Sequence, residues 1–208
     1  MKKILLIFLI INSIINCDSK AAAQTYLQLV ERGLQAVEHD SLPLAEKLFS
    51  QAIAADPENY SNALIYSNLA KVQEAQKKYT EALESYNAAL KQFPESMPFL
   101  NGRGNLLVKM KQYPAAKKDF QAVLKFHPNE YTASMGLATI DIDLERYDEA
   151  LNTLNLVIVG YPDEPYAYYL RAETEYRTGR YELARMDIDK ALELRPNDNL
   201  YLKFKEKL

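Results

Sequence analysis

One short segment recurs along the chain at a fixed interval. The segments KKYTEAL, KQYPAAK, ERYDEAL and GRYELAR each carry a tyrosine at their third position, and these tyrosines, Tyr79, Tyr113, Tyr147 and Tyr181, are evenly spaced. A catalytic site needs one copy, whereas a segment repeated in register is typical of a structural unit that stacks on copies of itself. We therefore expect the chain to fold as an array of repeats.

The same period appears at other positions when the sequence is aligned on five prolines. These are Pro57, Pro94, Pro128, Pro162 and Pro196, of which the last four have the same spacing as the tyrosines. Twelve residues before each proline stands an alanine: Ala45, Ala82, Ala116, Ala150 and Ala184. Twenty-four residues before it stands a small residue: Gly33, Ala70, Gly104, Ala138 and Ala172. The residues immediately before those alternate between arginine and leucine: Arg32, Leu69, Arg103, Leu137 and Arg171.

The recurring small residues predict pairs of closely packed helices. Two helices approach to about 8–10 Å where small side chains lie at their crossing. Gly33 and Ala45 supply such a crossing in the first repeat, and the bulky Phe49 fills the space beside it. The aligned proline ends the second helix of each pair, because its ring clashes with the preceding turn.

This pattern resembles the tetratricopeptide repeat, a helix-turn-helix unit of about 34 residues. The resemblance implies an all-α fold, a right-handed α-α superhelix of five repeats that share one hydrophobic core. The repeats cover residues 26–59, 63–96, 97–130, 131–164 and 165–198, with Tyr60, Ser61 and Asn62 inserted after the first. Residues 199–208 fit a closing helix, in which we expect Leu202 and Phe204 to cover the last apolar face.

Residues 1–17 have the pattern of a targeting segment. Lys2 and Lys3 precede an uncharged, apolar run from Ile4 to Ile15, and Cys17 follows shortly after. This arrangement is typical of a secretory signal. A helix of that length spans about 18 Å, less than the ~30 Å hydrocarbon core of a bilayer, which argues against a permanent transmembrane helix.

Cys17, the sole cysteine, resembles the acylated cysteine of bacterial lipoproteins. The resemblance implies removal of residues 1–16, lipid on Cys17 (palmitate among the acyl chains) and a tether over residues 17–25. Asn16 departs from the Gly, Ala or Ser that usually precedes that cysteine, so a plain cleaved signal is the alternative. We expect the protein to be lipid-anchored to a membrane of a bacterial envelope, facing the periplasm or the surface.

The face that binds a partner follows from the helical register. Residues 2, 5, 9 and 12 of each first helix lie on one side of it. In the resembling family this side lines a concave groove for partner peptides. The candidate groove residues here are Leu27, Val30, Leu34, Ser67, Asn68, Lys71, Asn101, Asn105, Lys109, Met135, Thr139, Tyr166, Tyr169, Glu173 and Tyr176.

The chemistry of these residues suits an extended peptide. Asparagine side chains both donate and accept hydrogen bonds, as recognition of a peptide main chain requires, and tyrosines offer a large contact area at low entropic cost. Two alternatives stay open. The N-terminal tether can cover Leu27, Val30 and Leu34, and the tyrosines can be ordinary surface residues.

Nothing in the sequence predicts catalysis, a cofactor or a metal site. His39 and His127, the two histidines, lie in different repeats without ligand spacing around them. The segment NGRGN at residues 101–105 lacks the lysine of a phosphate-binding loop. A net charge of −3 makes nucleic acid a poor partner.

The sequence thus predicts a non-catalytic protein-interaction scaffold or adaptor, which binds another envelope protein or peptide and supports assembly of a complex. An accessory subunit of an envelope hydrolase and a self-assembling structural protein, hence a homo-oligomer, are the alternatives.

Overall fold

The structure is a computed structural model that describes residues 23–208. The expected signal peptide, Cys17 and residues 17–22 of the expected tether lie outside the described residues. Residues 23–208 contain helices and turns and no strand, so the predicted all-α fold class is confirmed. Residues 23–25, which we expected in the tether, already belong to the first helix, which covers residues 23–38 of the described chain.

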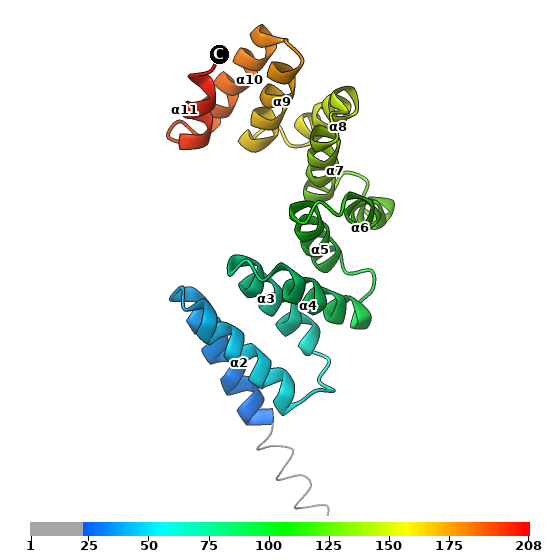
Figure 1. Ribbon diagram of the computed structural model, residues 1–208, viewed down its shortest axis with the longest axis vertical. Coiled ribbons are helices and arrows are strands. Elements are labelled where there is room, and N and C mark those ends of the chain that lie inside the picture. Colours follow the sequence, from blue (N-terminus) through cyan, green and yellow to red (C-terminus); the bar gives the residue numbers. More distant parts are fainter. Residues whose placement is uncertain (1–22) are drawn as a thin grey trace, which may run out of the picture. The chain divides into compact units, whose positions relative to one another are not determined.

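The chain divides into two compact units (Figure 1). The first ends at Phe99 and contains the helix of residues 23–38, α2 (Leu42–Ala55), α3 (Asn62–Ala75) and α4 (Tyr79–Gln92). The second begins at Leu100, within α5 (Met97–Lys109), and continues with α6 (Tyr113–Phe126), α7 (Tyr131–Asp143), α8 (Tyr147–Gly160), α9 (Pro165–Arg177), α10 (Tyr181–Leu194) and α11 (Asn199–Lys205).

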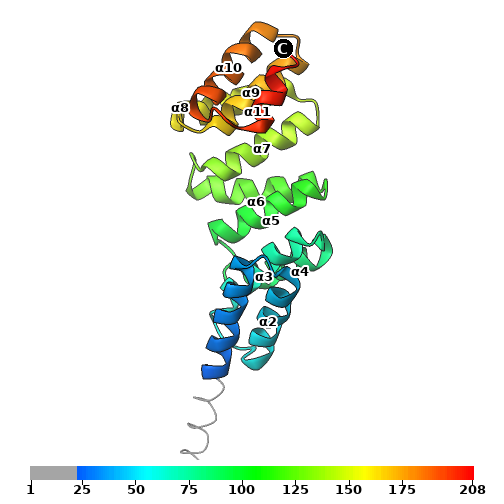
Figure 2. The same cartoon turned by 90° about the vertical axis from the view of Figure 1, so that its left-hand side faces the viewer.

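Consecutive helices pack against one another within each compact unit, as Figures 1 and 2 show. In the first unit α3 contacts both α2 and α4. In the second unit each helix from α6 to α11 contacts the next along the chain. Repeats one to five of the sequence correspond to successive helix pairs. Within each compact unit the pairs are joined by contacts between repeats, α2 with α3 in the first unit and α6 with α7 and α8 with α9 in the second, as repeat arrays require.

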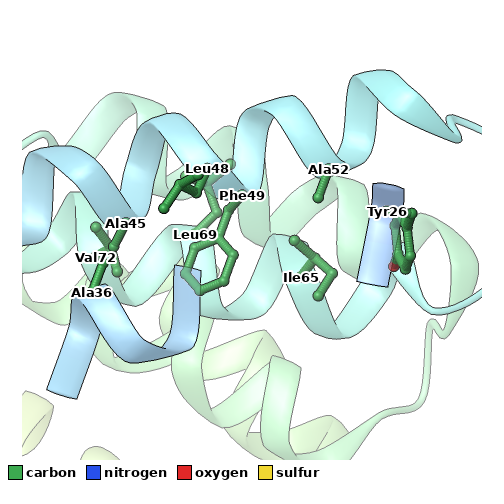
Figure 3. Close-up of a cluster of buried hydrophobic side chains, with 9 residues drawn as sticks. All are labelled: Tyr26, Ala36, Ala45, Leu48, Phe49, Ala52, Ile65, Leu69 and Val72. Atoms are coloured by element: carbon green, nitrogen blue, oxygen red, sulfur yellow. The ribbon is translucent and has the colours of Figure 1, made fainter. Parts of the chain in front are cut away.

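The small residues at the crossings make contact with large rings, as the sequence predicts. Gly33 lies against Phe49, and a Cβ atom on Gly33 would come within 2.6 Å of Phe49 Cε1. Figure 3 shows Phe49 among the buried side chains that fill the first compact unit, with Ala45 and Leu69 around it. In the second compact unit Phe120 of α6 is wholly buried between Gly104 of α5 and Gly136 of α7.

The turn inside each repeat has one residue in the left-handed region. It is the fifteenth residue of the repeat every time: Asp40, Lys77, Lys111, Glu145 and Gly179, with φ between 52° and 77°. The next residue donates its backbone N–H five residues back, for example Lys78 to the Gln73 carbonyl at 2.9 Å. This pattern satisfies the last carbonyls of the first helix. The tyrosine that follows begins the second helix; it is half-buried in repeats two to four and exposed in repeat five, where it is Tyr181.

Two partly buried ion pairs occupy the same register two repeats apart. Arg103 holds Asp119 through Nε and Nη2 at 2.8 and 2.7 Å, and Arg171 holds Asp187 at 2.6 and 2.7 Å. Both aspartates are buried on a second helix and both arginines project from a first helix. A fork of two hydrogen bonds fixes the helix pair in one geometry.

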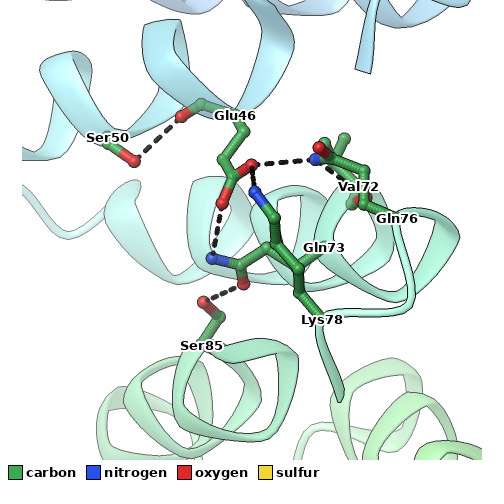
Figure 4. Close-up of polar contacts among 7 residues, drawn as sticks. All are labelled: Glu46, Ser50, Val72, Gln73, Gln76, Lys78 and Ser85. Carbon is green, nitrogen blue, oxygen red and sulfur yellow. Dashed lines mark hydrogen bonds and ion pairs between the residues drawn. The ribbon is translucent and has the colours of Figure 1, made fainter. Parts of the chain in front are cut away.

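A polar network connects α2, α3 and α4 in the first compact unit (Figure 4). Glu46 of α2 accepts hydrogen bonds from Lys78 at 2.6 Å, Gln76 at 2.8 Å and Gln73 at 3.5 Å. Ser85 of α4 donates to Gln73 at 2.8 Å. Burial acts to raise the pKa of Glu46, but the hydrogen bonds from Lys78 and Gln76 outweigh it and leave that pKa below its usual value.

The helix α11 covers the end of the second compact unit with residues other than those we expected. Phe204 is buried as predicted, but Leu202 is 41% exposed and Tyr201 takes its place at 1% exposed. The prediction for Leu202 was wrong because residues two apart in a helix point to nearly opposite sides, whereas residues three apart share a side.

Candidate partner-binding surfaces

The helix of residues 23–38 presents an apolar strip to solvent. Leu27 is 64% exposed, Leu34 and Val37 are also exposed, and Val30 is half-buried. Tyr26 and Ala36 of the same helix are buried in the core cluster, and Val30 packs against that cluster. The apolar surface of the helix of residues 23–38 is therefore wider than the part that the core covers. A contiguous exposed apolar surface is typical of an interaction site.

A hollow of about 430 Å³ lies beside the three-residue insertion and was not predicted from the sequence. Tyr60, Leu64, Phe93 and Phe99 line it, together with two serines. The rings of Tyr60 and Phe93 meet edge to face at 6.3 Å between centroids. The insertion itself was the signal available in the sequence, because an exposed aromatic residue inside a loop is more typical of binding than of packing.

Polar candidates of the second compact unit lie on α5. Asn105 and Lys109 are exposed one helical turn apart. Asn101, one turn earlier, is buried, and its Oδ1 atom finds no hydrogen-bond partner among residues 23–208. In the first compact unit Lys71 is exposed and Asn68 half-buried on α3.

Three of the predicted groove residues are buried inside helix contacts. Ser67, Asn101 and Met135 lie among the buried residues, so a partner reaches none of these side chains directly. All three stand at the fifth residue of their repeats. Thr139 is half-buried and donates its hydroxyl proton to the Met135 carbonyl at 2.9 Å, so toward a partner it can only accept a hydrogen bond.

The tyrosines of α9 form part of a cluster of rings. Tyr166 is exposed and stacks on Tyr169, with ring centroids 5.8 Å apart. Tyr169 also meets Tyr201 at 5.4 Å and Phe204 at 5.6 Å. Tyr176 meets Phe204 at 5.8 Å. The helix α11 thus packs against Tyr169 and Tyr176, two of the predicted groove tyrosines. The third, Tyr166, is exposed to solvent.

Charges around this cluster are paired. Glu173 accepts a hydrogen bond from Arg177 at 2.6 Å. Burial, followed by the nearby charge of Glu173, raises the pKa of Tyr169 to about 12. The exposed edge of the cluster offers a ring and a hydroxyl rather than a charge.

The helix α8 carries a second exposed apolar feature. Leu156 and Val159 are 75% and 81% exposed and lie at the edge of a hollow of about 400 Å³. The residues at the same register are Ala122 and Lys125 in repeat three and Lys190 and Glu193 in repeat five. Repeat four is therefore more apolar at this position than those two repeats, a difference that the periodic pattern does not predict.

His39 and His127 are both exposed, and they lie in different compact units. Within residues 23–208, no three His, Cys, Asp or Glu side chains gather as a metal site would require.

Family models for the tetratricopeptide repeat match residues 30–96, 107–174 and 165–198. Together these matches cover most of the described chain and agree with the helix pairs in the structure. The chain is a tetratricopeptide repeat protein. This family and fold are typical of non-catalytic scaffolds that bind proteins or peptides.

Solved tetratricopeptide repeat proteins share this fold at low sequence identity. One from Parabacteroides merdae is 23% identical, with a TM-score of 0.77, over 88% of this chain and 72% of its own. YrrB, described as having an unusual peptide-binding site, is 22% identical, with a TM-score of 0.65, over 91% of this chain and 97% of its own. MamA from Desulfovibrio magneticus is 15% identical, with a TM-score of 0.72, over 84% and 97%. No curated protein sequence matches this tetratricopeptide repeat protein.

None of the helices in the part of the chain that the structure describes has the length and apolar character to cross a bilayer.

Proposed function

We propose that this tetratricopeptide repeat protein is a non-catalytic scaffold that binds a partner protein or peptide and supports the assembly of a complex in a bacterial envelope. The observation that carries the proposal is the exposure of large side chains on the first helices of the repeats. Leu27 and Leu34 in the first compact unit, and Tyr166 in the second, lie open at the register positions where this family contacts its partners. Contiguous exposed apolar side chains are typical of a surface that a partner covers.

The proposed partner presents an extended segment with apolar side chains. The apolar strip of the first helix suits aliphatic or aromatic side chains, and the hollow lined by Tyr60 and Phe93 suits one more. Asn68 in the first compact unit and Asn105 in the second each offer an amide to a peptide main chain, since an amide matches the donor and acceptor of a peptide group. The peptide-binding site named for YrrB supports a peptide as the partner of this fold.

The proposed location is a bacterial envelope membrane, reached through a lipid on Cys17. The support is the sequence alone: two lysines, the apolar run from Ile4 to Ile15 and the sole cysteine shortly after it. More than one acyl chain is needed for stable anchoring, because a single chain gives only marginal binding to a bilayer.

Site-specific crosslinking tests the binding surface. A photoreactive amino acid at Leu34 or Asn105 should capture the partner in cells, and the same residue at Asn152 should not. Asn152 is the matched control because it is exposed on the second helix α8 of repeat four. Equal capture at all three positions contradicts the proposed surface. Capture of a second copy of this chain alone favours the self-assembling alternative over the adaptor.

Amide removal tests the polar part of the surface. Replacing Asn68 and Asn105 with alanine should weaken partner binding by about 1–2 kcal/mol for the lost hydrogen bonds, with helix content unchanged. Asn152→Ala removes an identical amide from α8 and should leave binding unaffected. If binding is unchanged after both asparagines are replaced, these amides are not part of the binding surface.

Anchoring is tested separately. Mass spectrometry of the mature N-terminus should find an acylated Cys17, and Cys17→Ser should release the protein from membranes. If the wild-type protein is soluble and Cys17 is unmodified, the lipid anchor is contradicted, and the proposal for partner binding is unaffected.

A further inference from the structure

One oxygen of a buried carboxyl group in repeat five has no hydrogen-bond partner in the described part of the chain. Glu175 of α9 is only 7% exposed, and its Oε2 atom is buried without a donor or acceptor among residues 23–208. Beside it lies a second buried acid, Asp187 of α10. Two acids of the same charge buried together are costly unless one of them is neutral.

The nearby positive charges are already engaged. Arg171 gives two hydrogen bonds to Asp187 and a third, from Nη1, to Asn155 of α8 at 2.7 Å. The guanidinium of Arg180 lies 3.5 Å from Asp148 of α8. Both arginines act to lower the pKa of Glu175, but neither makes a hydrogen bond to its carboxyl group that would hold it as an anion.

The remaining element packed against this pair of helices adds no charge to the pocket. The helix α11 meets α9 through the rings of Tyr201 and Phe204. Lys205 of α11 is paired with Asp189 at 2.7 Å, where both side chains are about half exposed. Burial and the charge of Asp187 therefore dominate, and they raise the pKa of Glu175 to about 7 from an ordinary 4.5.

Repeat two has a neutral residue at the same register. Gln73 is the eleventh residue of that repeat, as Glu175 is of repeat five, and both are buried. Gln73 accepts from Ser85 and donates to Glu46, so its amide is satisfied. Ser85 is in turn the register equivalent of Asp187. Repeat two thus has a hydrogen-bonded amide and a hydroxyl, Gln73 and Ser85, at the two positions where repeat five has the acids Glu175 and Asp187.

We propose that Glu175 is a proton-dependent lock on the hairpin of α9 and α10, which closes when its carboxyl group binds a proton and loosens when that proton is lost. The neutral group is tolerated in the buried site and becomes able to donate a hydrogen bond. The anion is left beside Asp187 without a donor. Because Tyr176 follows Glu175 and packs on Phe204, loosening of the hairpin also loosens α11.

The direction of the effect follows from proton linkage. A carboxyl group with a raised pKa binds more protons in the folded than in the unfolded chain. Its contribution to stability is full below about pH 4.5 and is lost as pH rises to about 7. Between pH 5.5 and pH 8 the opening equilibrium of the hairpin should shift by roughly 25-fold toward the open form.

Hydrogen exchange of the full-length chain measures this opening locally. Corrected for the intrinsic exchange rate, amides of α9 and α10 should lose protection in the wild type between pH 5.5 and pH 8, and those of Glu175→Gln should not. Glu173→Gln controls for loss of one carboxylate from α9, and it should keep the wild-type pH dependence. The α3–α4 hairpin, which carries Gln73, is an internal reference in the same samples.

Two results would overturn the proposal. One is an equal pH dependence of α9–α10 protection in the wild type and Glu175→Gln. The other is independent of any variant: an NMR titration of the wild-type Glu175 carboxyl carbon that shows no inflection between pH 6 and pH 8.

Discussion

The close contact of the Phe120 ring with Gly104 and Gly136 predicts that Gly104→Ala destabilises the protein. A Cβ atom at this position would lie 2.6 Å from Phe120 Cε1 and 2.8 Å from Cζ. Carbon atoms in contact prefer about 3.5–4.0 Å, so the ring would have to retreat by about 1 Å. It has no room to do so, because Gly136 faces its other side equally closely.

The magnitude follows from two opposing effects. Overpacking of a well-filled core costs about 1–3 kcal/mol, and alanine in place of a helical glycine returns about 0.5–1 kcal/mol. We expect Gly104→Ala to lower the free energy of unfolding by about 1–2 kcal/mol. In a Phe120→Leu background the clash disappears, and the same replacement should become neutral or slightly stabilising.

Urea unfolding followed by circular dichroism measures both effects. Gly160→Ala is the matched control, since no atom lies within 4 Å of a Cβ built there, and it should not destabilise the protein. The reasoning fails if Gly104→Ala has wild-type stability, or if its cost is the same with leucine at position 120.

Three further predictions concern other parts of the fold. Lys111→Gly should raise the free energy of unfolding by about 0.5–1 kcal/mol, because φ is 57° at this turn and glycine adopts it freely; unfolding in urea checks this, and a loss of stability contradicts it. Asp187→Ala should cost about 3 kcal/mol, since the partly buried Arg171 loses a fork of two hydrogen bonds and keeps the one to Asn155, while replacing both Arg171 and Asp187 with apolar residues should recover much of the loss in the same assay. Tyr201→Ala should cost about 3 kcal/mol and release α11, seen as faster hydrogen exchange there, with unchanged exchange counting against the role of this ring.

The parts of the fold that the sequence predicted are those fixed by local chemistry and period. Each second helix ends two residues before its proline, as Ala55 does before Pro57 and Gly160 before Pro162. Proline blocks helix continuation whatever lies around it, and a crossing needs a small residue in every repeat. These constraints are the same at each occurrence, so a single sequence reveals them.

The details of the candidate surfaces depend on which neighbour covers a residue, and the period does not contain that information. Asn101 and Asn105 are both polar and one turn apart, yet one is buried and the other exposed. Tyr169 lies at a predicted groove position but packs on α11, because the last repeat has a closing helix in place of another repeat. The hollow lined by Tyr60 and Phe93 depends on an insertion that interrupts the repeat.

The two forked ion pairs have a consequence for how such an array grows or shrinks. Arginine stands at the seventh residue of repeats one, three and five, and leucine stands there in repeats two and four, so the true sequence period at this position is two repeats. Excision of one internal repeat would make neighbours of two repeats that both have arginine, or both have leucine, at the seventh residue. Excision of two consecutive repeats would restore the original alternation. Each fork joins the two helices of a single repeat, so excision of whole repeats in either number leaves every remaining fork intact.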